Sequence, residues 1–291
     1  MTLPISACLI VRDEAAEIAG CVTAITPYVA EVLVADTGST DDTPKLAAEA
    51  GARVVEVAWR DDFAAARNAA TEACTHDWIL SVDADERPEG DPAAVRTLLG
   101  GDLGETAGFG IAFRIEGPNP RGAVPHRAVR LFRRSVARWR GRVHEEVVAS
   151  DGSPAVIAQL PERALALVHT GYADPAAFAR KVTRNLALAR AEVAGLANDG
   201  TSGERRVAAL LDLGRTELAA GLSGEGRATL GLVRDLARPG TPAWVWATDF
   251  LAWDDVRHAR LDRAWDLLGE LSDHGAGEQH VRPLTERLLR D

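Results

Sequence analysis

The stretch "DWILSVDADE", residues 77–86, runs an apolar segment directly into a group of acidic residues. Asp83 and Asp85 lie two positions apart, so both carboxylates can approach one cation where a strand ends in a turn. Hard divalent cations such as Mg²⁺ and Mn²⁺ bind a few carboxylate oxygens and complete their coordination with water or substrate phosphates. The spacing favours a site for a metal ion and a diphosphate over the alternative, a solvated acidic turn that caps the next helix.

A second acidic stretch, "VLVADTGSTDDT" at residues 32–43, places Asp36 at the end of another apolar run. The small residues that follow would let a ligand approach the backbone, and the carboxylate could bind ribose hydroxyls or a base edge. Ser39, Thr40 and Asp41 are also good helix-capping residues, so an N-capping turn is the alternative. The segment lacks the lysine and glycine spacing of phosphate loops and the G-x-G-x-x-G of dinucleotide folds.

Arginines in two further segments could contact a diphosphate. Arg67, in "WRDDFAAARNAA", lies on an expected helix ahead of the acidic strand. In "RAVRLFRRSVARWRGR", Arg130 and Arg133 alternate with apolar residues, a pattern that also fits a half-buried strand with a solvated face.

The elements that must position these residues alternate between β-branched runs and helical segments, which is typical of βαβ units. We expect strands at residues 5–11, 31–36, 53–59 and 77–83, with helices at residues 14–25, 41–52 and 63–74. Both acidic stretches then follow strand ends, at the sheet edge where open α/β folds bind ligands.

The pattern changes after about residue 105. Strands expected at residues 108–117, 128–134 and 137–148 make the sheet mixed, and five helical segments follow "HTGYADP". The segments "RATLGLV" and "RAWDLLG" recur about 36 residues apart, close to a tetratricopeptide period, although generic Leu/Ala patterning also explains them. We expect an α/β domain at residues 1–172 and an all-α region at residues 173–291.

Composition excludes several classes. The net charge of −10 argues against a general nucleic-acid binder, because phosphate recognition needs a basic surface. The three cysteines show no metal-type or paired spacing, which indicates buried thiols in a reducing compartment. No window approaches the roughly 20 apolar residues of a membrane span, and the start lacks a basic signal-type segment. We therefore expect a cytoplasmic protein with no integral membrane segment.

Six motifs occur together in one order: "ISACLIVRDEA", "VADTGSTDDT", "WRDDFAAARN", "DWILSVDADE", "RLFRR…WRGRVHEEV" and "HTGY…RN". Over roughly residues 4 to 190 the chain thus resembles the family 2 glycosyltransferases of the GT-A fold, of the bacterial cell-wall-biogenesis type. The resemblance implies a GT-A Rossmann-like mixed sheet flanked by helices. Some members of this subgroup also carry tetratricopeptide-like repeats, which agrees with a helical tail.

The resemblance also implies residue roles in binding the nucleotide. Asp36 would bind the base or ribose, helped by Arg12 and Glu14 at the end of the first strand. Arg67 would face the nucleotide, and Asp61 or Asp62 would touch the base.

For the metal and the reaction, the resemblance implies a further set. Asp83 would lie near the ribose or metal, and Asp85 would bind the metal that bridges the diphosphate. His169 matches a position where related enzymes supply a third metal ligand, and His144 is its competitor. A general base is also needed, and it is placed at "GRVHEEV". Glu145 is favoured, with Glu146 open because strand alternation would let only one of the two face the site.

These roles together predict a metal-dependent inverting glycosyltransferase of the hexosyltransferase class, using Mn²⁺ or Mg²⁺. A UDP-sugar is the favoured donor, because enzymes of the resembled family use it most often. The acceptor class stays open among peptide, saccharide, lipid carrier and small natural product. One alternative is a sugar nucleotidyltransferase, but such enzymes usually have a Gly-rich loop after the first strand, and the segment "LIVRDEAAEI" at that place is not Gly-rich. The other alternative is a non-catalytic nucleotide-binding scaffold.

Overall fold

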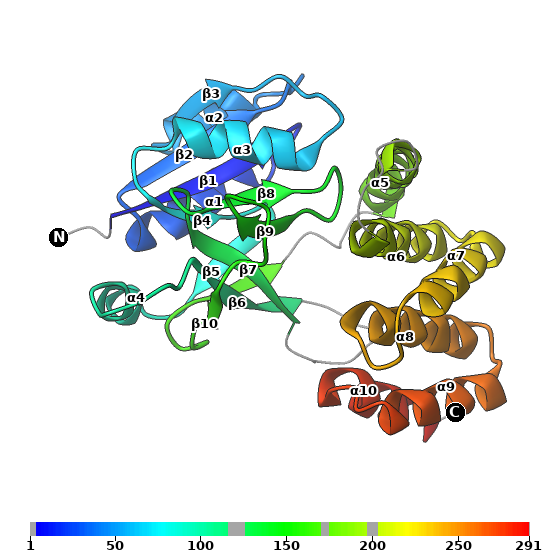
Figure 1. Cartoon of the computed structure of the whole chain (residues 1–291). Helices are drawn as coiled ribbons and strands as arrows, with labels where there is room; N and C mark the ends of the chain where they lie inside the picture. Colours follow the sequence, from blue (N-terminus) through cyan, green and yellow to red (C-terminus); the bar gives the residue numbers. More distant parts are fainter. Residues whose placement is uncertain (1–3, 116–125, 170–174, 197–202, 291) are drawn as a thin grey trace. The chain divides into compact units, whose positions relative to one another are not determined.

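The computed structural model describes residues 4–115, 126–169, 175–196 and 203–290. The chain divides into two compact units (Figure 1), one of residues 1–119 and 125–173 and the other of residues 120–124 and 174–291. The domain boundary expected between residues 172 and 173, and the "TGY" of the sixth motif, lie outside the described residues.

The first unit is built on a nine-stranded mixed sheet with the order β3-β2-β1-β4-β7-β6-β11-β5, and β10 pairs with β6. Its strands are β1 (Ile5–Val11), β2 (Glu31–Asp36), β3 (Arg53–Glu56), β4 (Trp78–Ser81), β5 (Glu86–Glu89), β6 (Gly108–Ile115), β7 (His126–Arg133), β10 (Ile157–Gln159) and β11 (Ala166–His169). The strands β3, β2, β1 and β4 are parallel, whereas β7 is antiparallel to both β4 and β6. A separate antiparallel pair consists of β8 (Ala137–Arg140) and β9 (Glu146–Ala149).

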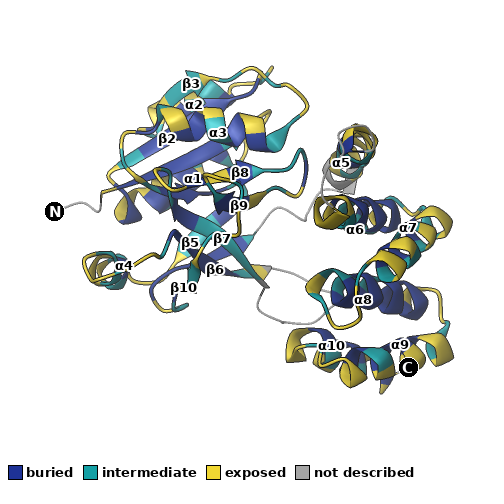
Figure 2. Cartoon of the chain, in the orientation of Figure 1, coloured by how far each residue is buried: buried dark blue, intermediate teal, exposed yellow. Residues whose placement is uncertain are grey.

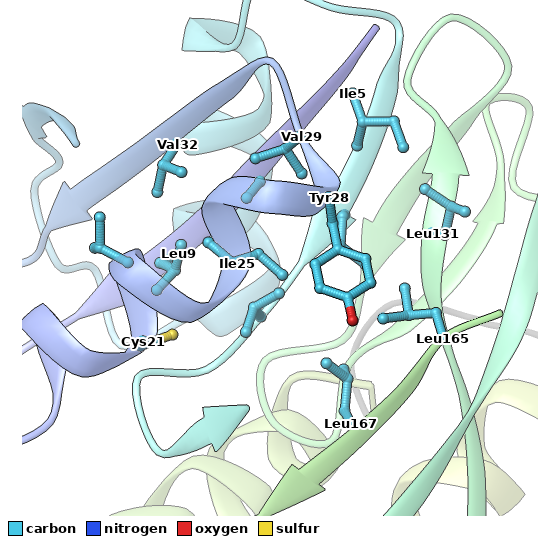
Figure 3. Close-up of a cluster of buried hydrophobic side chains, with 14 of the residues drawn as sticks. Ile5, Leu9, Cys21, Ile25, Tyr28, Val29, Val32, Leu131, Leu165 and Leu167 are labelled. Atoms are coloured by element: carbon cyan, nitrogen blue, oxygen red, sulfur yellow. The ribbon is translucent and has the colours of Figure 1, made fainter. Parts of the chain in front are cut away.

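Both faces of the parallel strands are covered, which explains their nearly continuous apolar sequences. Leu9 of β1 and Val34 of β2 pack in one cluster with α1 (Ile18–Ile25), α2 (Thr43–Glu49) and α4 (Pro92–Leu99). Figure 3 shows part of this cluster, with Leu9 beside Cys21 and Ile25 of α1. The alternate residues, such as Cys8 and Leu33, pack on the other face with α3 (Phe63–Ala73) and the β8–β9 pair. The central strands are accordingly the most buried part of this unit (Figure 2).

Several sequence expectations are confirmed and one is wrong. The first two strands have the expected bounds, and the third and fourth are shorter than expected. The single strand expected at residues 137–148 is instead two strands, β8 and β9, joined by a turn. Gly141 and His144 in that turn have φ of 103° and 55°, values that a regular strand does not accommodate.

The second unit is helical in the part that the structure describes. Its helices are α5 (Pro175–Leu196), α6 (Gly203–Ala219), α7 (Ser223–Leu236), α8 (Pro242–Arg257), α9 (Leu261–Asp273) and α10 (Glu278–Leu288). Helices adjacent in sequence pack together. α6 approaches α7 closely at Gly214, which has no side chain; a Cβ there would lie 2.7 Å from Leu230 Cγ. Trp244 and Trp253 are core residues, whereas Trp265 is 41% exposed. The segments "RATLGLV" and "RAWDLLG" lie in α7 and α9, and their status as a repeat stays a prediction.

Among the described residues, none of the helices has both the length and the apolar character that a membrane crossing requires.

One stability prediction arises from Glu31, the first residue of β2. Burial alone would raise its pKa, but hydrogen bonds from Ser6, Thr75 and Arg53 outweigh burial and lower the pKa to about 2. The stabilisation from ionised Glu31 is therefore complete above its ordinary pKa of 4.5 and is lost as the pH falls towards 2. We expect Glu31→Gln to lower the free energy of unfolding at pH 7 by about 1–2 kcal/mol, with the difference from wild type shrinking below pH 4.5. Urea unfolding between pH 3 and 7 measures this; a pH-independent difference would contradict it.

Candidate active site

The candidate site lies beyond the carboxyl end of β4, where segments distant in sequence meet. β4 ends at Ser81, beside Cys8 of β1, and the chain continues through the Asp83–Glu86 turn into β5. α3 contributes Arg67, β7 contributes Arg130, and the β8–β9 turn contributes Glu145.

Arg67 is the residue that joins these segments. Its guanidinium is buried and donates to Glu145 Oε1 at 2.5 Å, to Asp83 Oδ1 at 2.8 Å and to Ser81 Oγ at 3.0 Å. It also lies 5.2 Å from the ring centroid of Trp139. Burial would lower the pKa of Arg67, but Asp83 and Glu145 outweigh burial and raise it. Arg67 is therefore a permanent cation that holds two carboxylates from segments far apart in the sequence.

Asp83 is bound by a second arginine as well. Arg130 donates to Asp83 Oδ2 at 3.0 Å and to Glu86 Oε1 at 3.2 Å. Burial would raise the pKa of Asp83, but Arg130 and Arg67 outweigh burial and hold it well below its ordinary range. Asp83 is thus ionised with an arginine on each oxygen, yet its side chain is 35% exposed and can be reached by a ligand.

Glu86 is a site residue to which the sequence reasoning gave no role. Its Oε2 accepts a 2.8 Å hydrogen bond from the backbone N–H of Asp83, which holds the two ends of the acidic turn together. The side chain is 1% exposed, and burial raises its pKa to about 7. The D-x-x-E spacing was the available signal, because a Glu three residues on can reach back to a backbone N–H as in a capping box.

Asp85 and His169 form a second pair at the same turn. Asp85 Oδ2 lies 3.2 Å from His169 Nε2, and their side chains are 24% and 14% exposed. His169 ends β11 and pairs in register with Glu86, which brings it to the acidic turn. Among the described residues no group of three or more His, Cys, Asp or Glu side chains is arranged to hold a metal ion. A carboxylate and an imidazole nonetheless suit Mn²⁺, since a bound diphosphate and water would complete its coordination.

The Asp36 side chain folds back on its own turn, whereas the N-cap residue of α2 is Asp42, which makes no side-chain capping hydrogen bond. Asp36 accepts hydrogen bonds from Gly38 N at 3.2 Å and from Ser39 N at 3.1 Å, and also from the Ser39 hydroxyl. Glu14 N donates to Thr43 Oγ1 at 2.7 Å, which joins the loop after β1 to the start of α2. The nucleotide role of Asp36 and Glu14 stays a prediction.

The remaining predicted residues have other surroundings. Arg12 is 51% exposed and lies 3.9 Å from Asp13. Asp62 caps α3 by accepting a 2.8 Å bond from Ala65 N. Glu146 is 60% exposed and pairs with Arg140 at 2.6 Å, so the structure directs Glu145, not Glu146, to Arg67. His144 is exposed in the turn before Glu145.

Comparison with known protein families gives a match within the first unit. Residues 6–99 match the model of the family described as glycosyl transferase family 2. The resemblance to this family is therefore confirmed over the part of the chain that carries Arg67, Asp83 and Asp85. The first unit is a GT-A-like mixed sheet flanked by helices, and a helical region follows it.

Curated relatives match over short segments. A protein named as tetratricopeptide-repeat-containing, from Synechococcus elongatus, is 52% identical over 82 residues, which are 28% of this chain and 20% of the relative. An uncharacterised glycosyltransferase of Rickettsia felis is 42% identical over 82 residues, 28% of this chain and 29% of that protein. The chain thus matches less than a third of the length of either relative.

A solved structure gives a partial likeness. Glucosyl-3-phosphoglycerate synthase of Mycobacterium tuberculosis, in complex with Mn²⁺ and UDP-glucose, is 29% identical, with a TM-score of 0.33. The match covers 38% of this chain and 43% of the synthase.

Proposed function

We propose that the first unit is a metal-dependent glycosyltransferase that moves a sugar from a nucleotide donor to an acceptor with inversion. The observation that carries the proposal is the bridge by Arg67 between Asp83 and Glu145. It couples an Asp-x-Asp turn, suited to a metal and a diphosphate, to a carboxylate suited to a base. We propose that this unit corresponds to a catalytic domain of residues 1–172, with residues 173–291 as a helical region.

Asp85 and His169 are the residues that would hold Mn²⁺ or Mg²⁺. When bound, the metal would neutralise the charge that develops on the departing nucleoside diphosphate. Asp83 is held by Arg67 and Arg130, and it would lie near the ribose of the donor or beside the metal.

Glu145 would act as the general base. Glu145 Oε1 accepts a hydrogen bond from Arg67, and Oε2 would take the proton from an acceptor hydroxyl. The proton transfer and the attack on the anomeric carbon would occur on the face opposite the leaving group, and a single displacement of this kind inverts the configuration. A UDP-sugar is the proposed donor, on the strength of the family resemblance.

Calorimetric titration of UDP, GDP and dTDP tests the proposal, first with Mn²⁺ and then with a chelator. We expect one nucleotide, UDP in the first instance, to bind only when the metal is present. Binding of none of the three would contradict the proposal and favour a non-catalytic scaffold.

A substitution at Asp85 tests the metal site specifically. We expect Asp85→Asn to weaken Mn²⁺-dependent UDP binding by roughly 10- to 100-fold, because a neutral amide oxygen replaces the charged carboxylate that would bind the metal. The fold should persist, since the change relieves repulsion among clustered carboxylates. Asp102→Asn, at an exposed turn of the same unit, is the matched control and should leave binding unchanged. Equal metal dependence in both variants would remove Asp85 from the metal site.

A further inference from the structure

The loop between β3 and α3 carries an aromatic side chain that the proposed mechanism does not use. Trp59 is half-buried, and its indole Nε1–H donates to Asp61 Oδ1 at 2.8 Å. Its ring packs nearly edge-to-face on Phe63, with centroids 4.9 Å apart and an interplanar angle of 71°. Asp61 has a φ of 53°, a backbone conformation that residues with a Cβ adopt at a cost. The indole is therefore held in one orientation while part of its surface stays exposed.

This loop runs between two parts of the candidate site. Val57 N donates to the carbonyl of Asp36 at 2.8 Å, so the chain leaves β3 beside the Asp36 turn. Phe63 then begins α3, and Arg67 follows four residues later, on the same side of the helix. Trp59, which packs on Phe63, thus lies on the stretch of chain that joins the Asp36 turn to Arg67.

A fixed and partly exposed indole is a surface on which a planar base can stack. Such stacking tolerates any base, because every base has a π face. The carboxylates and arginines at the Asp83 turn are suited to bind charged groups and a metal ion. They provide no apolar surface for a base. Trp59 provides that surface on a neighbouring loop of the same unit.

We propose that Trp59 stacks on the base of the nucleotide donor and supplies affinity for the base without selecting its identity. This inference rests on the proposed function, since it requires a nucleotide at the Asp83 turn. It adds a positioning contact outside the metal and base residues. Loss of the ring should lower the affinity for the nucleotide that binds and leave the preference among bases unchanged.

The test measures binding of nucleoside diphosphate and of inorganic pyrophosphate, both with Mn²⁺, to wild type, Trp59→Ala and Trp59→Phe by calorimetry. We expect Trp59→Ala to weaken binding of UDP about 5- to 100-fold, the range found for loss of one base–aromatic stack. Pyrophosphate, which has no base, should bind within about twofold of wild type. Trp59→Phe keeps a stacking face and should stay within about threefold for UDP. Trp265→Ala, which removes an exposed Trp from the helical unit, is the control and should change neither affinity.

The outcomes separate this inference from the proposed function. If the wild type binds none of UDP, GDP or dTDP, the proposed function fails and the inference fails with it. If the wild type binds a nucleotide and Trp59→Ala binds it equally well, the inference alone is overturned. A loss of pyrophosphate affinity equal to the loss of UDP affinity would also overturn it, because Trp59 would then act by holding the loop. Circular dichroism of each variant checks that the fold is retained, and Trp59→Phe serves as the readout if the alanine variant unfolds.

Discussion

Glu145→Gln is expected to lose sugar transfer by roughly 10²- to 10⁴-fold while donor binding stays within about threefold of wild type. The substitution keeps the size of the side chain and an oxygen that can accept from Arg67, which donates to Glu145 Oε1 at 2.5 Å. It removes the ability to take a proton from the acceptor. The loss should therefore fall on kcat, measured as nucleoside diphosphate released in the presence of acceptor, and not on the affinity for the donor.

Glu146→Gln provides a matched control one residue away. Glu146 is 60% exposed and paired with Arg140 on the surface, so its change should alter turnover by less than about twofold. A large loss in Glu146→Gln with full activity in Glu145→Gln would move the base to Glu146. Equal and small effects in both would remove the base from this turn altogether.

Some of this site could be predicted from sequence because it depends on local pattern. Apolar runs that end at Asp36 and near Asp83 place both carboxylates at the ends of parallel strands, and the register of β1 with β2 and β4 confirms that edge. The same reasoning reaches Asp85, because alternation and turn geometry act over a few residues.

The partners of these residues could not be predicted in the same way. The contact between Arg67 and Glu145 spans 78 positions, and no periodicity relates a helix to a turn at that distance. The turn itself was missed because "ARWRGRVHEEVV" alternates like a strand, whereas Gly141 and His144 adopt left-handed backbone. The hydrogen bond from Asp83 N to Glu86 joins residues only three positions apart, so the D-x-x-E spacing could have predicted it. Interpreting the stretch only as a metal site left Glu86 without a role.

Arg67→Met should lower the free energy of unfolding of the first unit by about 3–5 kcal/mol, because it leaves the largely buried carboxylate of Glu145 without its counter-charge. Asp83 would keep Arg130, but Glu145, only 13% exposed, would lose its ion pair with Arg67, and Ser81 Oγ would lose a donor. Arg67→Lys should recover only part of the loss, since an ammonium group cannot reproduce the fixed fork that reaches three acceptors. Urea unfolding followed by circular dichroism measures the change.

Two comparisons decide whether unpaired charge is the cause of that loss. Arg114→Met removes an arginine whose pair with Glu89 is about half exposed, at 51% and 52%, and should cost no more than about 1 kcal/mol. Adding Glu145→Gln to Arg67→Met should restore part of the stability, because a neutral amide is cheaper to leave unpaired than a carboxylate. If the double variant is as unstable as the sum of the two single changes, the Arg67–Glu145 contact carries no coupling energy, and the bridge that supports the proposed mechanism would be a feature of packing alone.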